Sequence, residues 1–361
     1  MRRALELAAR GLGAVEPNPL VGCVVARGAE IIGEGWHRRF GGPHAEVEAL
    51  RMAGYRARGA TLYVTLEPCC HQGKTPPCVG AIVAAGVSRV VAAQRDPFPA
   101  VDGGGAAQLA TAGLAVEVGV CEAEVRRLNA PYLKLLRSGR PWVIAKWAMT
   151  LDGKTATATG SSRWISNARS RQVVHALRGR MDAILVGRRT VQIDDPLLTA
   201  RPPGPRTALR VVVDTAASIS PASRLVRTAG EVPVLVAAAP EAPEESRRRL
   251  AEAGCEVFLC SGDGRDERLG ALLDELGRRR MTNLLVEGGG ELLGTLLDRG
   301  WIDEVHVFVA PKLVGGRDAP SALAGWGISE MDRALSLEVE ETRLLDGDLY
   351  VRGHVPPAPS G

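Results

Sequence analysis

Apolar and polar positions in the first third of the chain alternate between strand-like and helix-like periods. The runs VGCVVA (21–26) and IIGEGWH (31–37) flank a short turn, which predicts a β-hairpin. Residues 44–54 have helical spacing and end on a glycine, and a second helix is expected at 78–86, between strands at 61–66 and 89–94. Strands separated by helices of this length predict an α/β sandwich with a largely parallel sheet.

The pattern changes near residues 122–140, which read as one charged helix followed by a turn at Gly139 and Pro141. A chain of 361 residues is long for a single core, so we place a boundary here and predict domains at 1–139 and 140–361. A second α/β series follows. Its strands are expected at 142–149, 183–187, 209–214, 232–239, 282–290 and 303–311.

Composition and charge narrow the class of protein. The formal net charge of +4 and the 4% of aromatic residues do not form the basic, aromatic-lined surface that a nucleic-acid binder needs. No apolar run reaches membrane-spanning length, and charges interrupt the N-terminal MRRALELAARGLG, where a secretory signal would be continuously apolar. We therefore expect a cytoplasmic enzyme that binds neither nucleic acid nor membranes.

The loop EPCCHQGKTPPC (67–78) gathers three of the seven cysteines beside a histidine. An odd cysteine count in a large chain without a signal argues against a disulfide framework. Zinc takes about four nitrogen or thiolate ligands, and a catalytic zinc keeps one position open. His44, which opens the predicted helix at 44–54, could complete such a site with Cys69 and Cys78, and Cys70 and His71 are competing ligands.

Glu46 lies two residues after His44, where it could move a proton between the attacking water and a substrate nitrogen. H-x-E followed by P-C-x-x-C is the signature of zinc nucleobase deaminases, but here the outer cysteines lie much further apart. Two alternatives stay open. One is a deaminase of free nucleotides or nucleic acid fused to an unrelated domain. The other is a zinc-stabilised binding module, which would have a fourth protein ligand and no use for Glu46.

The second half of the chain carries its own candidate chemistry. Lys146 lies within an apolar strand, where an ammonium group is costly unless it faces a cleft or a partner. Asp194 and Asp195 precede a proline, in either a helix-ending turn or a polar site, with Arg201 close behind. Residues 283–297 (NLLVEGGGELLGTLL) predict a strand, a glycine turn and a helix, a common phosphate cradle, with Glu287 at the end of the strand.

The chain contains the motifs PNPLVGCVV, PHAEVEAL, EPCCHQGKTPPC, KWAMTLDGKTA, WIS, DAILVG and DDPLLTAR. These motifs resemble those of the bifunctional riboflavin-biosynthesis deaminase–reductases, and the resemblance extends beyond VEGGGELLG. Members of this family deaminate a diaminopyrimidinone that carries a phosphoribosylamino group, then reduce its ribose to ribitol with NADPH. The resemblance implies an N-terminal cytidine-deaminase-like α/β/α sandwich followed by a dihydrofolate-reductase-like α/β domain.

The resemblance also implies individual residues of the deaminase domain. These are the zinc ligands His44, Cys69 and Cys78, the proton carrier Glu46, the pyrimidine contact Asn18, and the phosphoribosyl contacts His71 and Lys74. One zinc ion per chain is expected. The chain departs from the family at Cys70, where small polar residues are common, and at Phe98, where asparagine is usual.

For the reductase domain, the resemblance implies a cofactor site and a substrate site. The NADPH contacts are Ala148, Trp164, Thr190, Asp194, Gly289, Gly290, Glu291, Leu292, Leu293, Gly294 and Thr295. The substrate contacts are Ser162, Arg178, Leu198, Arg201 and Glu287. Hydride would pass from the nicotinamide to the ribose C1′, and Lys146, Asp194 and Glu287 are alternative groups for polarising or protonating the opening ribose. We also expect a homo-oligomer.

Overall fold

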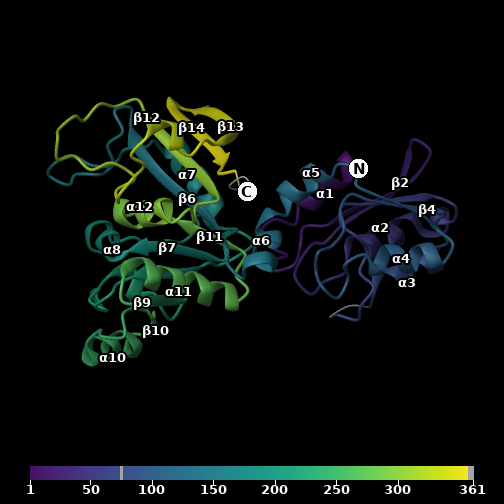
Figure 1. The fold of residues 1–361 in the computed structure, drawn as a ribbon, viewed down its shortest axis with the longest axis horizontal. Helices are drawn as coiled ribbons and strands as arrows, with labels where there is room; N and C mark the ends of the chain where they lie inside the picture. Colours follow the sequence, from purple (N-terminus) through teal and green to yellow (C-terminus); the bar gives the residue numbers. More distant parts are fainter. Residues whose placement is uncertain (74–75, 357–361) are drawn as a thin grey trace. The chain divides into compact units, whose positions relative to one another are not determined.

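The chain divides into two units between Gly139 and Arg140 in the computed structural model, which describes residues 1–73 and 76–356 (Figure 1). Gly139 ends the last helix of the first unit with φ +67°, a left-handed conformation that glycine adopts without steric cost. None of the described helices is both long and apolar enough to cross a membrane.

The first unit is a five-stranded sheet with helices on both faces. Its elements are α1 (Arg2–Ala9), β1 (Gly22–Arg27), β2 (Glu30–Trp36), α2 (Ala45–Ala53), a 3₁₀ turn (Gly54–Ala57), β3 (Thr61–Val64), α3 (Cys78–Ala85), β4 (Arg89–Ala92), α4 (Gly104–Thr111), β5 (Ala115–Val118), α5 (Glu122–Leu128) and α6 (Ala130–Ser138). The strands lie in the order β2-β1-β3-β4-β5. The hairpin predicted from the first two apolar runs is confirmed as β1 and β2.

The expectation of a largely parallel sheet is wrong for this unit. β1 pairs antiparallel with both β2 and β3, and only the pairings of β3 with β4 and of β4 with β5 are parallel. The two-residue connection between β1 and β2 can only reverse the chain, whereas helical crossovers through α3 and α4 return it in the same direction.

The two faces of this sheet bury different residues of the same strand, because successive side chains of a strand point to opposite sides. Cys23 and Val25 of β1 belong to the core under α2 and α3. Val24 between them packs against Ala4 and Leu7 of α1 on the other face. The first unit is therefore an α/β/α sandwich.

Residues 122–140 form two helices instead of the single predicted one. The break falls at Asn129, whose side-chain oxygen accepts a hydrogen bond from the Leu20 amide (2.7 Å) and whose amide nitrogen donates to the Leu20 carbonyl (3.0 Å). Asn129 therefore serves a distant segment of the chain, and α6 begins directly after it with Pro131 in its first turn.

The second unit is built on a nine-stranded sheet. Its elements are β6 (Trp142–Thr150), α7 (Ala168–Arg178), β7 (Ala183–Gly187), α8 (Arg188–Asp194), β8 (Leu209–Val213), α9 (Arg224–Arg227), β9 (Val234–Ala238), α10 (Glu244–Glu252), β10 (Glu256–Leu259), α11 (Arg265–Arg278), β11 (Asn283–Val286), α12 (Gly290–Asp298), β12 (Glu304–Ala310), a 3₁₀ turn (Met331–Arg333), β13 (Glu338–Leu345) and β14 (Asp348–His354). The order is β10-β9-β8-β7-β11-β6-β12-β14-β13. All strands from β10 to β12 run parallel, and β14 and β13 are antiparallel additions at one edge.

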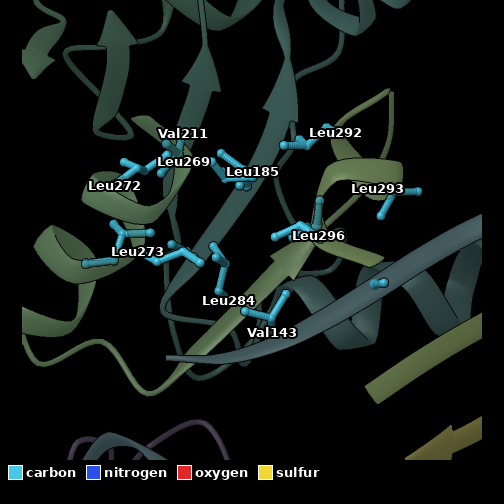
Figure 2. Packing of buried hydrophobic residues seen from close by; sticks show 14 of the residues in the cluster. Val143, Leu185, Val211, Leu269, Leu272, Leu273, Leu284, Leu292, Leu293 and Leu296 are labelled. Atoms are coloured by element: carbon cyan, nitrogen blue, oxygen red, sulfur yellow. The ribbon is translucent and has the colours of Figure 1, made fainter. Parts of the chain in front are cut away.

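Helices cover both faces of the parallel part of this sheet. Figure 2 shows one face, where residues such as Leu185 and Leu284 of the strands meet Leu272 of α11 and Leu296 of α12. The other face buries Ile184 and its neighbours against α7, α8, α9 and α10. With both faces covered, the carboxyl edge of the strands is where polar side chains can gather.

The close approach of α2 to β2 provides a stability test. A Cβ atom added at Gly35 would lie 2.4 Å from the Ala45 carbonyl oxygen and 2.5 Å from the Ala49 amide nitrogen. We predict that Gly35→Ala pushes α2 outward and lowers the free energy of unfolding by about 1–3 kcal/mol, measured by urea denaturation. Gly80→Ala is the matched control. It lies exposed on α3 with nothing within 4 Å, so it should be neutral or stabilising by up to about 1 kcal/mol. Equal losses in both variants would contradict this account of the packing.

Candidate active sites

Three potential metal ligands converge in the first unit from separate elements. His44 is the N-cap of α2, Cys78 is the first residue of α3, and Cys69 lies in the loop after β3. One donor atom from each lies within 4.8 Å of the others, with His44 Nδ1 3.1 Å from Cys78 Sγ and 3.4 Å from Cys69 Sγ. Tetrahedral zinc separates a nitrogen and a sulfur ligand by about 3.6 Å. The donor set therefore fits zinc.

The competing ligands do not join this cluster among the described residues. The Cys70 thiol donates to the Ala100 carbonyl oxygen, and the His71 ring lies beside the Phe98 ring, with centroids 5.6 Å apart. His71 Nδ1 is buried and has no hydrogen-bond partner within the described part of the chain. Lys74 lies outside the described residues.

The electrostatics of the cluster favour a thiolate. Hydrogen bonds from the Cys78 thiol and from His44 lower the pKa of Cys69 to about 4, and the Cys78 amide also donates to its sulfur (3.3 Å). The pKa of Cys78 is raised, because it shares its proton with Cys69 and because it is buried. Metal binding displaces such a shared proton, so the pair is ready to become two thiolate ligands.

Glu46 lies in the first turn of α2, next to the three donors, and is only 3% exposed. Burial raises its pKa, and the neighbouring Cys69 charge acts in the same direction. A buried carboxyl group with a raised pKa can both accept and return a proton near neutral pH. Glu46 lies beside the cluster and outside its three donors, and its role as the proton carrier stays a prediction.

His37 was missed by the sequence reasoning, although it lies only seven residues before His44. It is 4% exposed, and its Nδ1 lies 3.0 Å from the Pro43 carbonyl oxygen, which requires a proton on Nδ1. Nε2 therefore accepts a hydrogen bond from the Asn18 side-chain amide (3.3 Å). Burial lowers the pKa of His37, which keeps the ring neutral and fixes the orientation of Asn18.

Glu67 was also missed, and it anchors the cysteine loop. It is buried, and its carboxylate accepts hydrogen bonds from the backbone amides of Asp96 (3.2 Å), Gly103 (3.0 Å) and Ala106 (2.9 Å). These donors come from the segment after β4 and from the start of α4, so Glu67 ties the cysteine loop to that side of the sheet.

The second unit contains a cavity of about 1420 Å³ at the carboxyl edge of its parallel strands. Such a volume exceeds what one small ligand fills and can take a dinucleotide and a substrate together. The predicted residues that line it are Lys146, Ala148, Ser162, Trp164, Arg178, Thr190, Asp194, Leu198, Arg201, Glu287, Gly289, Gly290, Glu291, Leu292 and Leu293.

Two residues of the predicted cofactor turn do not line the cavity. A Cβ atom on Gly294 would lie 1.9 Å from the Ala324 carbonyl oxygen, so this glycine serves the packing of α12. The Thr295 hydroxyl donates to the Glu291 carbonyl oxygen (2.9 Å) inside the same helix. Gly294 and Thr295 therefore have a packing role, whereas Gly289 and Gly290 at the start of the turn face the cavity.

A buried ion cluster lies in the wall of the cavity. The Arg178 guanidinium donates to both oxygens of the Glu287 carboxylate (2.5 and 2.8 Å), and Lys146 Nζ lies 3.9 Å from the same carboxylate. Burial by itself raises the pKa of Glu287, but Arg178 and Lys146 outweigh it, so the pKa is lowered. Burial lowers the pKa of Lys146 and Glu287 partly restores it. Glu287 is therefore ionised, and Lys146 is an easier proton donor than an exposed lysine.

The glycine turn between β11 and α12 fits a phosphate group. Gly288 and Gly289 have φ values of +122° and +81°, and the Thr190 hydroxyl lies 3.9–4.0 Å from where a Cβ atom would stand on either of them. Backbone N–H groups at such a turn can approach an anion because no side chain intervenes. Asp194 lies at the end of α8, where the Ser162 hydroxyl donates to its carboxylate (3.5 Å).

Two family models match the chain, one in each unit. The cytidine and deoxycytidylate deaminase zinc-binding region matches residues 1–94, and the RibD C-terminal domain matches residues 141–351. Fold and sites together define a bifunctional enzyme with a zinc-binding deaminase unit and a reductase unit.

Known members of one family match this chain over nearly its whole length. The riboflavin biosynthesis protein RibD of Aquifex aeolicus is 42% identical and covers 97% of this chain and 96% of its own. The structure of Acinetobacter baumannii RibD superposes with a TM-score of 0.87 at 37% identity, covering 99% of this chain and 98% of its own. A second structure is that of a Thermotoga maritima diaminohydroxyphosphoribosylaminopyrimidine deaminase/5-amino-6-(5-phosphoribosylamino)uracil reductase. It superposes with a TM-score of 0.85 at 35% identity, covering 99% of this chain and 97% of its own.

The chain belongs to the RibD family, the bifunctional deaminase–reductases of riboflavin biosynthesis. The fold class and the family resemblance predicted from the sequence are both confirmed.

The ion cluster gives a second stability test. Arg178→Met would leave the buried Glu287 carboxylate with the more distant Lys146 as its remaining ion-pair partner among the described residues, so we predict a loss of roughly 3 kcal/mol in the free energy of unfolding. Adding Glu287→Gln removes the unpaired charge and should restore at least half of that loss. Urea denaturation followed by tryptophan fluorescence reports this unit, because five of the six tryptophans follow residue 139. Simply additive losses in the double variant would contradict the pairing.

Proposed function

We propose that the chain deaminates 2,5-diamino-6-(5-phosphoribosylamino)pyrimidin-4-one and then reduces the ribosyl group of the resulting 5-amino-6-(5-phosphoribosylamino)uracil with NADPH. The observation that carries the proposal is the convergence of His44, Cys69 and Cys78 beside the buried Glu46. The Thermotoga maritima relative, which is named for both activities, supports the same pair of substrates.

In the deaminase unit, His44, Cys69 and Cys78 would hold one zinc ion per chain. When bound, zinc would lower the pKa of water to roughly 7 and so make hydroxide available at neutral pH. The Glu46 carboxylate would accept the proton of the attacking water and return it to the amine nitrogen as ammonia leaves. An amine is a poor leaving group until it is protonated, which is why the second transfer matters.

Substrate contacts in this unit would come from Asn18, His71 and Lys74. Asn18 would lie against the pyrimidine, and its amide is already oriented by His37. The unpartnered Nδ1 of His71 supports a ligand contact at that atom. Lys74 would supply a cationic donor for the phosphate, which remains a prediction from the sequence.

In the reductase unit, the cofactor would lie along the cavity wall formed by Ala148, Trp164, Thr190 and the turn at Gly289. When bound, NADPH would supply the hydride that is added at the ribose C1′. Ser162, Leu198 and Arg201 would contact the substrate, with Arg201 suited to its phosphate.

Of the three candidates for the proton, Lys146 is the best placed. Glu287 is held ionised by Arg178, so it has no proton to give, and it would orient the Lys146 ammonium. Lys146 would donate from Nζ to the ring oxygen as the ribose opens. Asp194 would hold the loop around Ser162 and contact the cofactor.

We also propose that the enzyme forms a homo-oligomer. Large apolar side chains stay exposed on the second unit, among them Trp326 (96%), Met331 (89%) and Leu344 (77%), and such residues are enriched at interfaces. A cytoplasmic location stays a prediction.

Glu46→Gln tests the division of roles, since glutamine keeps the size of the side chain but cannot carry a proton. We predict that deamination falls by about 10²–10⁴, while zinc content and reduction of supplied deaminated intermediate are unchanged. Both products are followed with and without NADPH. Glu48→Gln in the same turn is the control, because Glu48 pairs with the exposed Arg51 (2.7 Å), is not one of the three clustered donors and should leave both steps intact.

The reciprocal variant Lys146→Ala should deaminate normally and accumulate the deaminated intermediate. A zinc-free Glu46→Gln protein would make Glu46 a ligand or a structural support. Normal deamination by that variant would refute its role as the proton carrier.

A further inference from the structure

The reductase cavity continues past the glycine turn, over the carboxyl ends of β8 and β9. Its wall there is apolar and made of small or branched residues, namely Val213, Ala237, Ala238, Ala239, Leu269 and Leu272. Four strand spacings separate β6, beside the proposed nicotinamide position, from β9, a span of about 19 Å. A dinucleotide extended from β6 through the glycine turn would place its adenine against this apolar wall.

Several arginines line this end of the cavity, and they differ in how their charges are compensated. Arg265 is paired with Glu291 (2.6 Å), and the head group of Arg268 lies 3.7 Å from Glu241. Arg188, the first residue of α8, donates to the neutral hydroxyl of Ser218 (3.2 Å). No carboxylate of the described residues lies within ion-pair distance of Arg188. Its charge and most of its donors are thus left for a ligand.

A buried carboxylate holds the partner of Arg188 in place. Asp214 is 1% exposed and accepts hydrogen bonds from the Ser218 amide (2.5 Å), the Ile219 amide (2.7 Å) and the Ser218 hydroxyl (3.1 Å). In doubly wound dinucleotide-binding folds, an acidic residue can bind the hydroxyls of an unphosphorylated adenosine ribose and so favour NADH. Asp214 is covered and already occupied by these three donors, and it does not line the cavity.

Arg188 and Thr190 line the same cavity. Thr190 stands against the glycine turn, and Arg188, two residues earlier, is the first residue of α8. With the pyrophosphate at the turn and the adenine on the alanine wall, the adenosine ribose would lie between them, on the side of the cavity that Arg188 lines. A planar guanidinium with several donors matches the geometry of a phosphate group.

We propose that Arg188, held by Ser218, binds the 2′-phosphate of the adenosine ribose and makes the reductase unit select NADPH over NADH. This assignment rests on the proposed reductase function, and it names the residue that distinguishes the two cofactors.

The test measures equilibrium binding without turnover. Dissociation constants for NADPH, NADH, 2′,5′-ADP and 5′-AMP are determined by titration calorimetry on the full chain and on Arg188→Ala. The parent should bind each 2′-phosphorylated ligand more tightly than its unphosphorylated counterpart. Arg188→Ala should weaken the binding of NADPH and 2′,5′-ADP about 10- to 100-fold, as expected for lost charge-assisted hydrogen bonds. The affinities for NADH and 5′-AMP should change less than about twofold.

Two further arginine variants act as controls. Arg265→Ala removes an arginine that is already paired with Glu291, so it should leave the ratio of NADPH to NADH affinity unchanged. Arg189→Ala removes the neighbouring cavity-lining arginine, whose guanidinium, unlike that of Arg188, has no hydrogen bond among the described residues to hold it in place, and it should also leave the ratio unchanged.

The outcomes separate this assignment from the proposed function. A parent protein that binds neither dinucleotide overturns the reductase proposal itself. Equal affinity of the parent for both dinucleotides, an equal loss for both in Arg188→Ala, or a change of the ratio in Arg189→Ala instead overturns the role of Arg188 while the dinucleotide site stands.

Discussion

The deaminase site depends on how closely helix α2 can lie against strand β2. Cβ atoms on Gly33 and Gly35 would lie 2.3 and 2.4 Å from carbonyl oxygens of α2, so only glycine allows this packing. The same helix carries His44 at its N-cap and Glu46 in its first turn. Its distance from the sheet therefore sets the distance of the proposed metal ligand and of the proposed proton carrier from the cysteine loop. Glu67 in turn fixes that loop through three backbone amides.

The cavity of the reductase unit depends instead on buried charges that compensate one another. Lys146, Arg178 and Glu287 together leave one excess positive charge in the cavity wall, and the glycine turn adds backbone N–H donors nearby. Both expected ligands carry phosphate, so the positive balance supports binding to either. The same arrangement keeps Glu287 ionised and leaves Lys146 as the group that can release a proton. In the proposed reaction, binding and chemistry would thus draw on one set of side chains.

Much of this could be predicted from the sequence, because the informative signals are local. Apolar runs marked most of the strands, and H-x-E with the long cysteine loop marked the donor cluster that the structure brings together. Interactions across the chain could not be predicted in this way. Asn129 splits a predicted helix because it bonds to Leu20, 109 residues away. The antiparallel pairing of β1 with β3 likewise joins segments separated by a helix.

The residues that the sequence did not reveal also depend on partners far away in the chain. Glu67 accepts hydrogen bonds from amides 29–39 residues away, and Arg188 donates a hydrogen bond to a hydroxyl 30 residues later. His37 lies close to His44 in sequence, but its structural role depends on its hydrogen bonds to Asn18 and to the Pro43 carbonyl. The roles given to the individual site residues stay predictions, whereas family, fold class and the pair of activities are established by the comparisons.

We propose that the cysteine loop forms the rim of a catalytic zinc site with three protein ligands and one open position. X-ray absorption spectroscopy of the zinc-loaded protein can count these ligands. We expect two sulfur ligands and one imidazole nitrogen, with a light oxygen or nitrogen atom in the fourth position, and an unchanged spectrum in Cys70→Ser. A third sulfur ligand that disappears in Cys70→Ser would contradict it, because the site would then be closed and structural.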